Sequence, residues 1–199
     1  MPQAISISQS LQTMRVLWAA LIGSVFVYPV VLVATHHVEP SAHPPDTTMV
    51  IMFSVMSVAV AVASVVMPKT LARNAIAQRL AADPLPTEER QDYDDRGEHG
   101  FREAAAVRRR RVFSNPVEAE QMAHRMGRTP FILGMALAEA VAHFGLTLGI
   151  LGAGLWYAAP FFVVCLALQV PRFPTREGLL RAFEEGAGVF FPEDYLRTR

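Results

Sequence analysis

The chain has 199 residues, a formal net charge of zero at pH 7 and 52% hydrophobic residues, with a mean hydropathy of +0.27. The apolar residues form long uninterrupted blocks, which excludes an ordinary soluble domain and indicates a membrane protein. The single cysteine, Cys165, excludes an intramolecular disulfide and a cysteine metal site, and we interpret it as a small apolar side chain.

Four apolar segments are long enough to cross a membrane as helices. A spanning helix needs about 20 residues to cover a hydrocarbon layer of about 30 Å. The four segments contain 20, 20, 22 and 17 residues, and they cover 16–35, 49–68, 130–151 and 155–171. The sequence therefore predicts an all-α integral membrane four-helix bundle.

Positive charges are unevenly distributed among the connections. Twelve of the 18 Lys and Arg residues lie between Lys69 and Arg128, and five follow Pro171. The connections at 36–48 and 152–154 contain none. By the positive-inside rule, both termini and the middle loop are cytoplasmic, and we expect a multi-pass protein of the cell inner membrane.

The predicted domains follow from these helices. They are transmembrane helices 1 and 2 in 1–68, a cytoplasmic loop in 69–129, transmembrane helices 3 and 4 in 130–171, and a cytoplasmic tail in 172–199. No convincing signal-peptide cleavage site follows the first apolar segment, so we expect the first helix to be retained.

The first two apolar segments carry small residues at spacings that allow close helix packing. Ala20 and Ser24 lie one turn apart in the first segment, and Ala59, Ala61 and Ala63 recur in the second. We interpret both sets as packing residues.

The connection between the first two helices contains three histidines. His36, His37 and His43 are plausible nitrogen ligands for a metal such as zinc. Their spacing matches no closed metal motif, and three prolines stiffen the segment. A solvated loop is therefore the favoured interpretation, and the histidines are a weak metal candidate.

The cytoplasmic loop alternates between helical and polar composition. Residues 70–82 are expected to continue the second helix, and the proline-rich residues 83–86 end it. Residues 87–100 are acidic and polar without an apolar face, so we expect them to be flexible. Residues 101–113 return to a helix-like pattern, which makes the loop partly helical and partly flexible.

Four consecutive arginines lie near the end of this loop: Arg108, Arg109, Arg110 and Arg111. They can bind anionic lipid headgroups or a protein partner. Nucleic acid is disfavoured because no aromatic platform accompanies the arginines and because the chain soon returns to the membrane.

The cytoplasmic tail contains one amphipathic segment. Residues 178–186 are expected to form a short helix with Leu179, Leu180 and Phe183 on one side. Such a helix can lie on the membrane surface or pack beneath the bundle.

One carboxylate, Glu139, interrupts the third apolar segment. It lies nine residues after Pro130, roughly 13 Å into the membrane. An ionised acid there costs about 2.5 kcal/mol or more, so it needs a partner, a proton or a function. His143 follows four residues later on the same helical face. Two interpretations remain open: a proton carrier, and a carboxyl group held in a packed interface by a hydroxyl or a backbone group.

Residues 115–151 resemble the loop and second helix of the proteolipid c subunit of rotary ATP synthases. The matching elements are Asn115-Pro116 with Glu118, Ala136-Leu137-Ala138-Glu139-Ala140, and Phe144-Gly145-Leu146. In that family the glutamate binds the transported proton or sodium ion as the ring turns. The resemblance implies this role for Glu139.

The resemblance extends more weakly over residues 48–152, and helices 1 and 4 lie outside it. The family's glycine repeat is replaced here by alanines, and its short loop by about sixty residues. Sodium-binding members surround their glutamate with hydroxyl and amide ligands. Here no hydroxyl follows Glu139 until Thr147, so a proton is favoured over sodium.

The leading functional prediction is a relative of c-type proteolipids in which Glu139 and His143 bind or translocate protons. Membrane lipids and other copies of the chain are the expected partners. The alternative is a membrane scaffold that docks a protein partner through its cytoplasmic loop. An enzyme is disfavoured because the sequence contains no nucleophile–base pair or metal motif, and no cofactor is expected.

Overall fold

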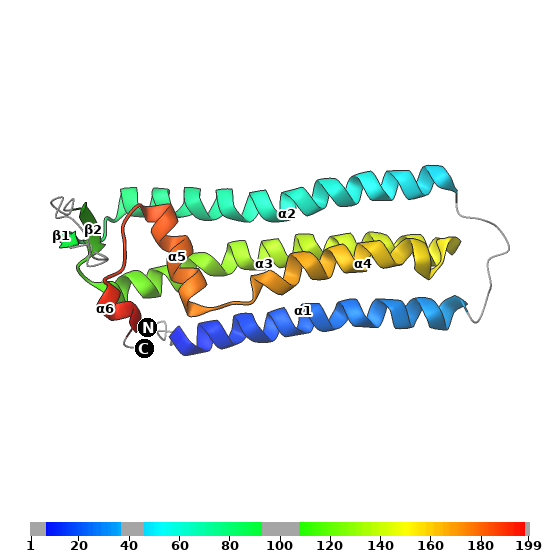
Figure 1. Ribbon diagram of the computed structural model, residues 1–199, viewed down its shortest axis with the longest axis horizontal. Coiled ribbons are helices and arrows are strands. Elements are labelled where there is room, and N and C mark those ends of the chain that lie inside the picture. Colours follow the sequence, from blue (N-terminus) through cyan, green and yellow to red (C-terminus); the bar gives the residue numbers. More distant parts are fainter. Residues whose placement is uncertain (1–6, 37–45, 93–107, 198–199) are drawn as a thin grey trace, which may run out of the picture. The chain divides into compact units, whose positions relative to one another are not determined.

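The computed structural model describes residues 7–36, 46–92 and 108–197 (Figure 1). These residues are mostly helical, and two short turns of other helix types, η1 (Gly149–Ala153) and η2 (Val170–Arg172), follow α3 and α4. The main elements in chain order are α1 (Ile7–His36), α2 (Thr47–Ala82), β1 (Thr87–Asp92), β2 (Arg108–Phe113), α3 (Pro116–Leu148), α4 (Leu155–Gln169), α5 (Arg176–Ala187) and α6 (Glu193–Arg197).

The chain divides into two compact units. The first unit comprises Met1–Leu71 and Arg128–Thr175, and the second comprises Ala72–Gly127 and Arg176–Arg199. The boundaries fall inside the long helices α2 and α3, so each of these helices contributes residues to both units.

Four helical segments of the described chain are long and apolar enough to span a membrane. They cover Ser8–Thr35, Thr47–Ala82, Pro116–Ala153 and Leu155–Arg172. The multi-pass membrane protein predicted from the four apolar blocks is therefore confirmed at the level of helix length and composition.

Two of these helices extend beyond their apolar segments. α2 continues to Ala82, as the composition after residue 69 predicted. α3 begins at Pro116, well before the start expected at residue 130. Local chemistry explains the earlier start, because Asn115 Oδ1 accepts a hydrogen bond from the backbone N–H of Glu118 at 3.4 Å and proline suits the first helical position.

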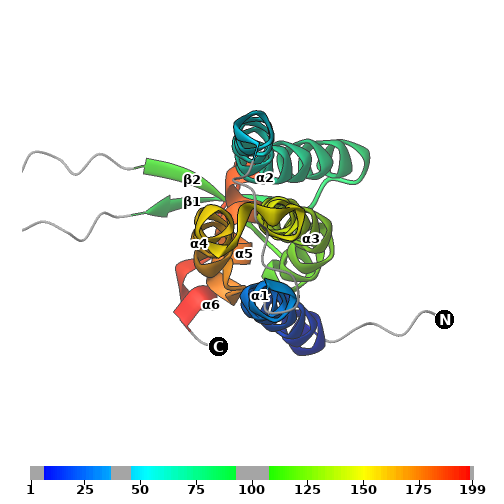
Figure 2. The same cartoon turned by 90° about the vertical axis from the view of Figure 1, so that its right-hand side faces the viewer.

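In the first unit, α1 and α2 pack on the hairpin formed by α3 and α4 (Figure 1 and Figure 2). One buried cluster joins α1 to this hairpin and consists of Val25, Leu32, Ala142, Ala158, Phe162 and Cys165. A second cluster contains Val141, Leu148, Ala153 and Phe161, against which Phe53, Val60 and Ala61 of α2 pack. The hairpin is therefore covered by α1 in one cluster and by α2 in the other.

A tight turn at η1 joins α3 to α4. Gly152 and Gly154 have φ angles of 97° and 79°, a left-handed conformation that glycine adopts without steric cost. The close approach of the two helices depends on Gly145. A Cβ atom at this position would lie 2.7 Å from Cβ of Phe161 and 2.9 Å from the carbonyl oxygen of Ala158. Gly145 thus has a packing role in this hairpin.

Arg172 in η2 connects three elements of the first unit. Its guanidinium donates hydrogen bonds to the carbonyl oxygen of Gly134 at 2.6 Å and to the carbonyl oxygen of Ser64 at 2.9 Å. These acceptors belong to α3 and α2. On α1, Trp18 donates from Nε1 to the carbonyl oxygen of Gln169 at 3.0 Å, so backbone carbonyls near the end of α4 also bind α1.

The second unit contains a two-stranded antiparallel sheet, β1–β2, which the all-α prediction missed. Its register pairs Thr87 with Phe113. Phe190 extends the pairing, because its N–H donates to the carbonyl oxygen of Arg111 and its own carbonyl accepts from the N–H of Phe113, both at 3.0 Å.

The sheet corrects two expectations about the loop. Residues 87–92 were expected to be flexible and residues 108–113 to be helical, and both predictions were wrong. Pairing between segments that are distant in the sequence supplies their backbone hydrogen bonds, and local composition does not reveal such pairing. Residues 93–107 lie outside the described chain.

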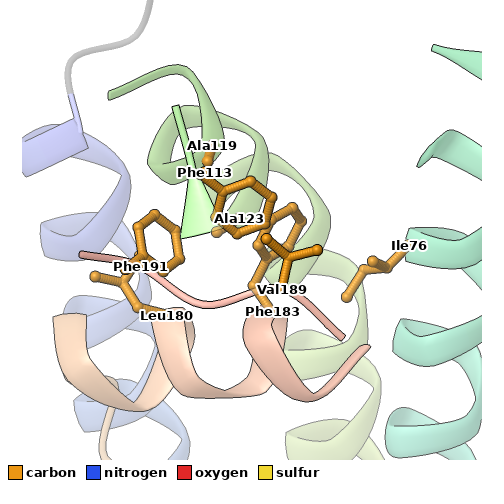
Figure 3. Close-up of a cluster of buried hydrophobic side chains, with 8 residues drawn as sticks. All are labelled: Ile76, Phe113, Ala119, Ala123, Leu180, Phe183, Val189 and Phe191. Carbon is orange, nitrogen blue, oxygen red and sulfur yellow. The ribbon is translucent and has the colours of Figure 1, made fainter. Parts of the chain in front are cut away.

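A hydrophobic core holds the second unit together (Figure 3). It consists of Ile76, Phe113, Ala119, Ala123, Leu180, Phe183, Val189 and Phe191. The ring centroids of Phe113 and Phe191 lie 5.1 Å apart. α5, the helix predicted in the tail, places Leu180 and Phe183 in this core with exposed fractions of 1% and 2%. These two side chains are therefore covered within the second unit and are not available to a membrane surface.

Candidate functional site

The carboxyl group of Glu139 meets two hydroxyl groups from α1. Ser24 Oγ and Tyr28 Oη lie 2.7 Å and 2.8 Å from the same carboxyl oxygen, Oε1. Ser24 and Tyr28 are four residues apart on α1, so they share one helical face. A polar site is thus assembled from α1 and α3 among otherwise apolar helices.

His143 adds an imidazole to this site. Its Nδ1 lies 3.0 Å from the carbonyl oxygen of Glu139, and its Nε2 lies 3.3 Å from Tyr28 Oη. When the ring carries its proton on Nδ1, it donates to that carbonyl, and Nε2 can accept from Tyr28. The hydroxyl of Tyr28 therefore lies within hydrogen-bond distance of both the carboxyl group and the imidazole.

The site has a buried side and an exposed side. Met135 and Ala142, on the same face of α3 as Glu139, have an exposed fraction of 0%. Glu139 is half-buried, and His143 is exposed. The structure thus brings together the two residues that the helical period placed on one face, and His143 is the more accessible of the two.

Glu139 has no cationic partner in the part of the chain that the structure describes. No lysine or arginine there lies within ion-pair distance of its carboxyl group. A carboxyl group that is held by neutral dipoles can be neutralised by a proton, whereas an arginine partner would fix its negative charge.

Sequence reasoning missed Tyr28 and assigned Ser24 to helix packing. A signal was present, because both residues lie near the middle of the first apolar segment, as Glu139 does in the third. No hydroxyl follows Glu139 along α3 until Thr147, but α1 supplies two hydroxyls to its carboxyl group. The preference for a proton over sodium therefore needs a different basis.

The weak metal candidate falls at the edge of the described chain. The side chain of His36 and all of His37 and His43 lie outside the described residues. Within residues 7–36, 46–92 and 108–197, no group of three or more His, Cys, Asp and Glu side chains is arranged to hold a metal ion.

The four arginines lie in β2, where successive side chains project to opposite sides of the sheet. Arg110 places its guanidinium over the ring of Phe190, with 5.1 Å between Cζ and the ring centroid, and Arg111 is exposed. The side chains of Arg108 and Arg109 lie outside the described residues. Arg110 and Arg111, which are successive residues of β2, therefore project to opposite sides of the sheet.

A second carboxylate on α3, Glu120, belongs to a buried ionic cluster that sequence reasoning missed. Glu120 is 1% exposed, and Arg176 binds it with an Nε–Oε1 distance of 2.6 Å and an Nη2–Oε2 distance of 3.1 Å. Tyr195 Oη also donates to Oε2, and His124 Nε2 lies 3.8 Å from Oε1. The hydrogen bond from Arg176 to the carboxylate raises the pKa of the guanidinium.

A cavity of about 220 Å³ also lies in the second unit. It is lined by Arg90, Phe113, Ser114, Pro116, Pro192, Asp194 and Tyr195. Its two charged lining residues, Arg90 and Asp194, lie 3.8 Å apart, so they partly neutralise each other. The charges that line the cavity therefore favour neither an anionic nor a cationic ligand.

Comparison with protein-family models, curated proteins and solved structures finds no match for this chain. The resemblance of residues 115–151 to the proteolipid c subunit therefore rests on the sequence motif. Any functional assignment depends on the geometry around Glu139.

Proposed function

We propose that this chain is a multi-pass protein of the cell inner membrane, folded as a four-helix bundle with both termini cytoplasmic, in which Glu139 binds and releases a proton. One observation carries the proposal. The carboxyl group lies among apolar helices, and its partners are two hydroxyl groups, with an imidazole adjoining them and no cation among the described residues.

The depth of the site supports this role. Glu139 lies nine residues after Pro130, roughly 13 Å along the third apolar segment. Ser24 lies eight residues after Val16, roughly 12 Å along the first. Contact between their side chains joins the middle of one apolar segment to the middle of the other, which is the arrangement expected for a site near the centre of a membrane.

The hydroxyl partners allow the carboxyl group to exist in both protonation states. A hydroxyl donates to a carboxylate, and it accepts from a protonated carboxyl group. Ser24 and Tyr28 can therefore satisfy Glu139 before and after it loses its proton. Apolar surroundings disfavour the ionised form, so a proton is the simplest way to neutralise the site.

The imidazole favours a proton over a sodium ion. Hard cations prefer oxygen ligands, whereas an imidazole nitrogen is a good proton acceptor. His143 Nε2 faces the hydroxyl of Tyr28, which is one of the two hydroxyls around the carboxyl group. The site thus combines an acid and a base, as proton transfer requires.

The relation to c-type proteolipids and the orientation are parts of the same proposal. The motif around Glu139 supports the relation, and the concentration of Lys and Arg residues in the middle loop and tail supports cytoplasmic termini. The hydroxyl partners of Glu139 come from α1, outside the matching segment. We therefore propose a proteolipid-like site that is completed within one chain.

Carbodiimide labelling of the purified full-length protein in lipid nanodiscs tests the proposal. These reagents modify protonated carboxyl groups in apolar surroundings, and mass spectrometry locates the adduct. We expect labelling of Glu139 that fades as the pH is raised, and Glu139→Gln should remove that adduct and leave other modified sites unchanged. Glu118, an exposed carboxylate on the same helix, is the internal control.

Two results would contradict proton binding at Glu139. Absence of the adduct at every pH, with the helices folded by circular dichroism, would indicate a carboxyl group that is permanently held in a packed interface. Protection from labelling by sodium chloride but not by potassium chloride would instead indicate a sodium site formed by the carboxyl group and the two hydroxyls.

A membrane scaffold is the second candidate function, and the second unit favours it. This unit has its own hydrophobic core, and Arg111 is exposed on its sheet. Such a folded module is a suitable docking surface for a protein partner. A scaffold would keep its complex in native membranes after Glu139→Gln and lose it when Arg110 and Arg111 are both changed to Gln, as size-exclusion chromatography of the solubilised complex would detect.

A further inference from the structure

Tyr28 connects the two titratable groups of the candidate site. Its hydroxyl oxygen lies 2.8 Å from Oε1 of Glu139 and 3.3 Å from Nε2 of His143. The Tyr28 and His143 rings also lie in contact, with 5.2 Å between their centroids. One hydroxyl group therefore spans the gap between an acid and a base.

We propose that Tyr28 relays a proton between Glu139 and His143, so that Glu139 exchanges its proton through the imidazole. This inference rests on the proposed function, because it requires that Glu139 binds a proton. It adds a residue from α1 that the sequence motif does not include, and it assigns the point of exchange to His143.

The relay conserves atoms and charge at each step. The protonated carboxyl group of Glu139 gives its proton to Tyr28 Oη as the original hydroxyl proton of Tyr28 passes to His143 Nε2. One O–H bond breaks at Glu139 and one forms at Tyr28, while the original Tyr28 O–H bond breaks and an N–H bond forms at His143. The result is a carboxylate, a neutral tyrosine and an imidazolium whose Nδ1–H still donates to the carbonyl oxygen of Glu139.

The exposure of the groups sets the direction of exchange. Glu139 and Tyr28 are half-buried, whereas His143 is exposed. His143 also lies four residues further along α3, roughly 6 Å towards the turn at η1. The relay therefore moves the proton from the interior of the helix bundle to its surface, at a position closer to η1 than the carboxyl group.

The other titratable group near the carboxyl is not placed to compete with this relay. The Cys165 thiol of α4 is buried in the cluster that contains Ala142 and Val25, away from solvent. On α2, the second helix packed on the hairpin, the residues that pack against the buried cluster include Met49, Val50, Phe53, Val60 and Ala61, which are all apolar. Tyr28 and His143 are thus the titratable groups that hydrogen-bond to Glu139 from α1 and from α3 itself.

Ser24 provides a matched control for Tyr28. Its hydroxyl contacts the same carboxyl oxygen at 2.7 Å, but its other neighbour is the backbone carbonyl oxygen of Leu21, also at 2.7 Å. A backbone carbonyl cannot pass on a proton. Ser24 can therefore stabilise the carboxyl group without relaying its proton. Removing each hydroxyl in a separate variant distinguishes stabilisation of the carboxyl group from proton relay.

The test is a pH jump on the full-length protein in lipid nanodiscs, followed by time-resolved infrared spectroscopy of the protonated carboxyl band that Glu139→Gln abolishes. We expect Tyr28→Phe to retain the band and to slow its change by at least about tenfold, because a proton-transfer group is lost. Ser24→Ala should change the midpoint pH of the band with little effect on its rate. The phenylalanine keeps the ring that lies 6.1 Å from Phe162, so packing is retained.

His143→Gln is the second variant, and it changes a side chain at the surface of the helix bundle. It should slow the exchange as Tyr28→Phe does, and the double variant should be no slower than either single one. Unchanged rates in both single variants, or equal slowing by Tyr28→Phe and Ser24→Ala, would overturn the relay while leaving proton binding intact. A wild-type protein without a titrating carboxyl band would instead overturn the proposed function itself.

Discussion

Helix α3 carries two glutamates whose partners differ in kind. Glu120, in the second unit, is 1% exposed and is bound by the guanidinium of Arg176 and the hydroxyl of Tyr195. Glu139, in the first unit, is half-buried and meets the hydroxyls of Ser24 and Tyr28. The same side chain on the same helix is thus paired with a cation in one place and with neutral groups in the other.

This difference shows that the partners of a carboxylate decide whether its negative charge is fixed or whether it can also be protonated. An arginine at hydrogen-bond distance stabilises the ionised form and makes loss of either partner costly. Hydroxyl groups accept either protonation state, so they stabilise the site without fixing its charge. The comparison supports a structural role for Glu120 in the second unit, and it is consistent with the proposal that Glu139 binds a proton.

The sharpest test applies one substitution to both glutamates. Glu120→Gln leaves the half-buried guanidinium of Arg176 without its counter-charge, so we expect the second unit to lose about 3 kcal/mol of stability. Glu139→Gln keeps an oxygen for both hydroxyls, so the first unit should lose less than about 1 kcal/mol. Hydrogen exchange of α5 and of α1, measured by mass spectrometry in nanodiscs, reports the two units separately. Equal losses of stability in the two variants would contradict the different roles of Glu120 and Glu139.

Arg172 extends the comparison, because it is a cation in the first unit that binds backbone carbonyls instead of a carboxylate. Arg172→Met removes the hydrogen bonds to Gly134 and Ser64, and we expect the first unit to lose about 2 kcal/mol. Arg172→Lys keeps the positive charge but loses the planar set of N–H donors that reaches two carbonyls. Its loss of stability should therefore lie between those of wild type and Arg172→Met. Thermal unfolding in detergent measures both. A lysine variant as stable as wild type would mean that charge at this end of α4 matters and the two hydrogen bonds do not.

The first unit also depends on close helix contact at Gly145. Gly145→Ala would place Cβ 2.7 Å from Phe161, and we expect a loss of about 1 to 3 kcal/mol from overpacking. Gly23→Ala is the control, because no atom lies within 4 Å of its added Cβ and the helix should gain up to about 1 kcal/mol. The same thermal unfolding assay compares the two variants. A tolerated Gly145→Ala would indicate that the α3–α4 hairpin adjusts freely.

The smallest expected effect concerns Glu184, a carboxylate of the second unit that has no arginine at hydrogen-bond distance among the described residues. Burial raises its pKa above the ordinary value of 4.5, although the N–H of Phe191 donates to it at 2.7 Å. Because the folded chain retains this proton to higher pH, its contribution to stability is present below the unfolded pKa and is lost as pH rises through the folded pKa. Glu184→Gln should weaken that decline, as hydrogen exchange of α5 corrected for intrinsic rates will report. A variant with an unchanged pH profile would contradict this assignment.

Local sequence was sufficient for the features that depend on composition and helical period. The uninterrupted apolar runs indicated four spanning helices, because a membrane requires about 20 apolar residues per helix whatever their partners are. The spacing of four residues placed Glu139 and His143 on one face. The tail helix around Phe183 was also visible in its amphipathic pattern.

The strands and the ionic cluster were not predictable in this way. β1 and β2 are stabilised by each other and by Phe190, and the run of arginines in β2 has a composition that is equally suited to a helix. Glu120 and Arg176 are 56 residues apart in the sequence, and neither lies in a motif that marks the other as a partner.

The sequence by itself determined the class of protein, the number of apolar helices and the presence of an acid in the middle of one of them. Tertiary structure alone decided the partners of that acid, since Ser24 and Tyr28 lie 115 and 111 residues away from it. The physical reason is that apolar length and helical period are properties of neighbouring residues, whereas hydrogen bonds between helices depend on which faces meet. The position of a carboxyl group in an apolar segment sets its depth in the membrane. Only the packing of α1 on α3 decides that its partners are hydroxyl groups and not an arginine.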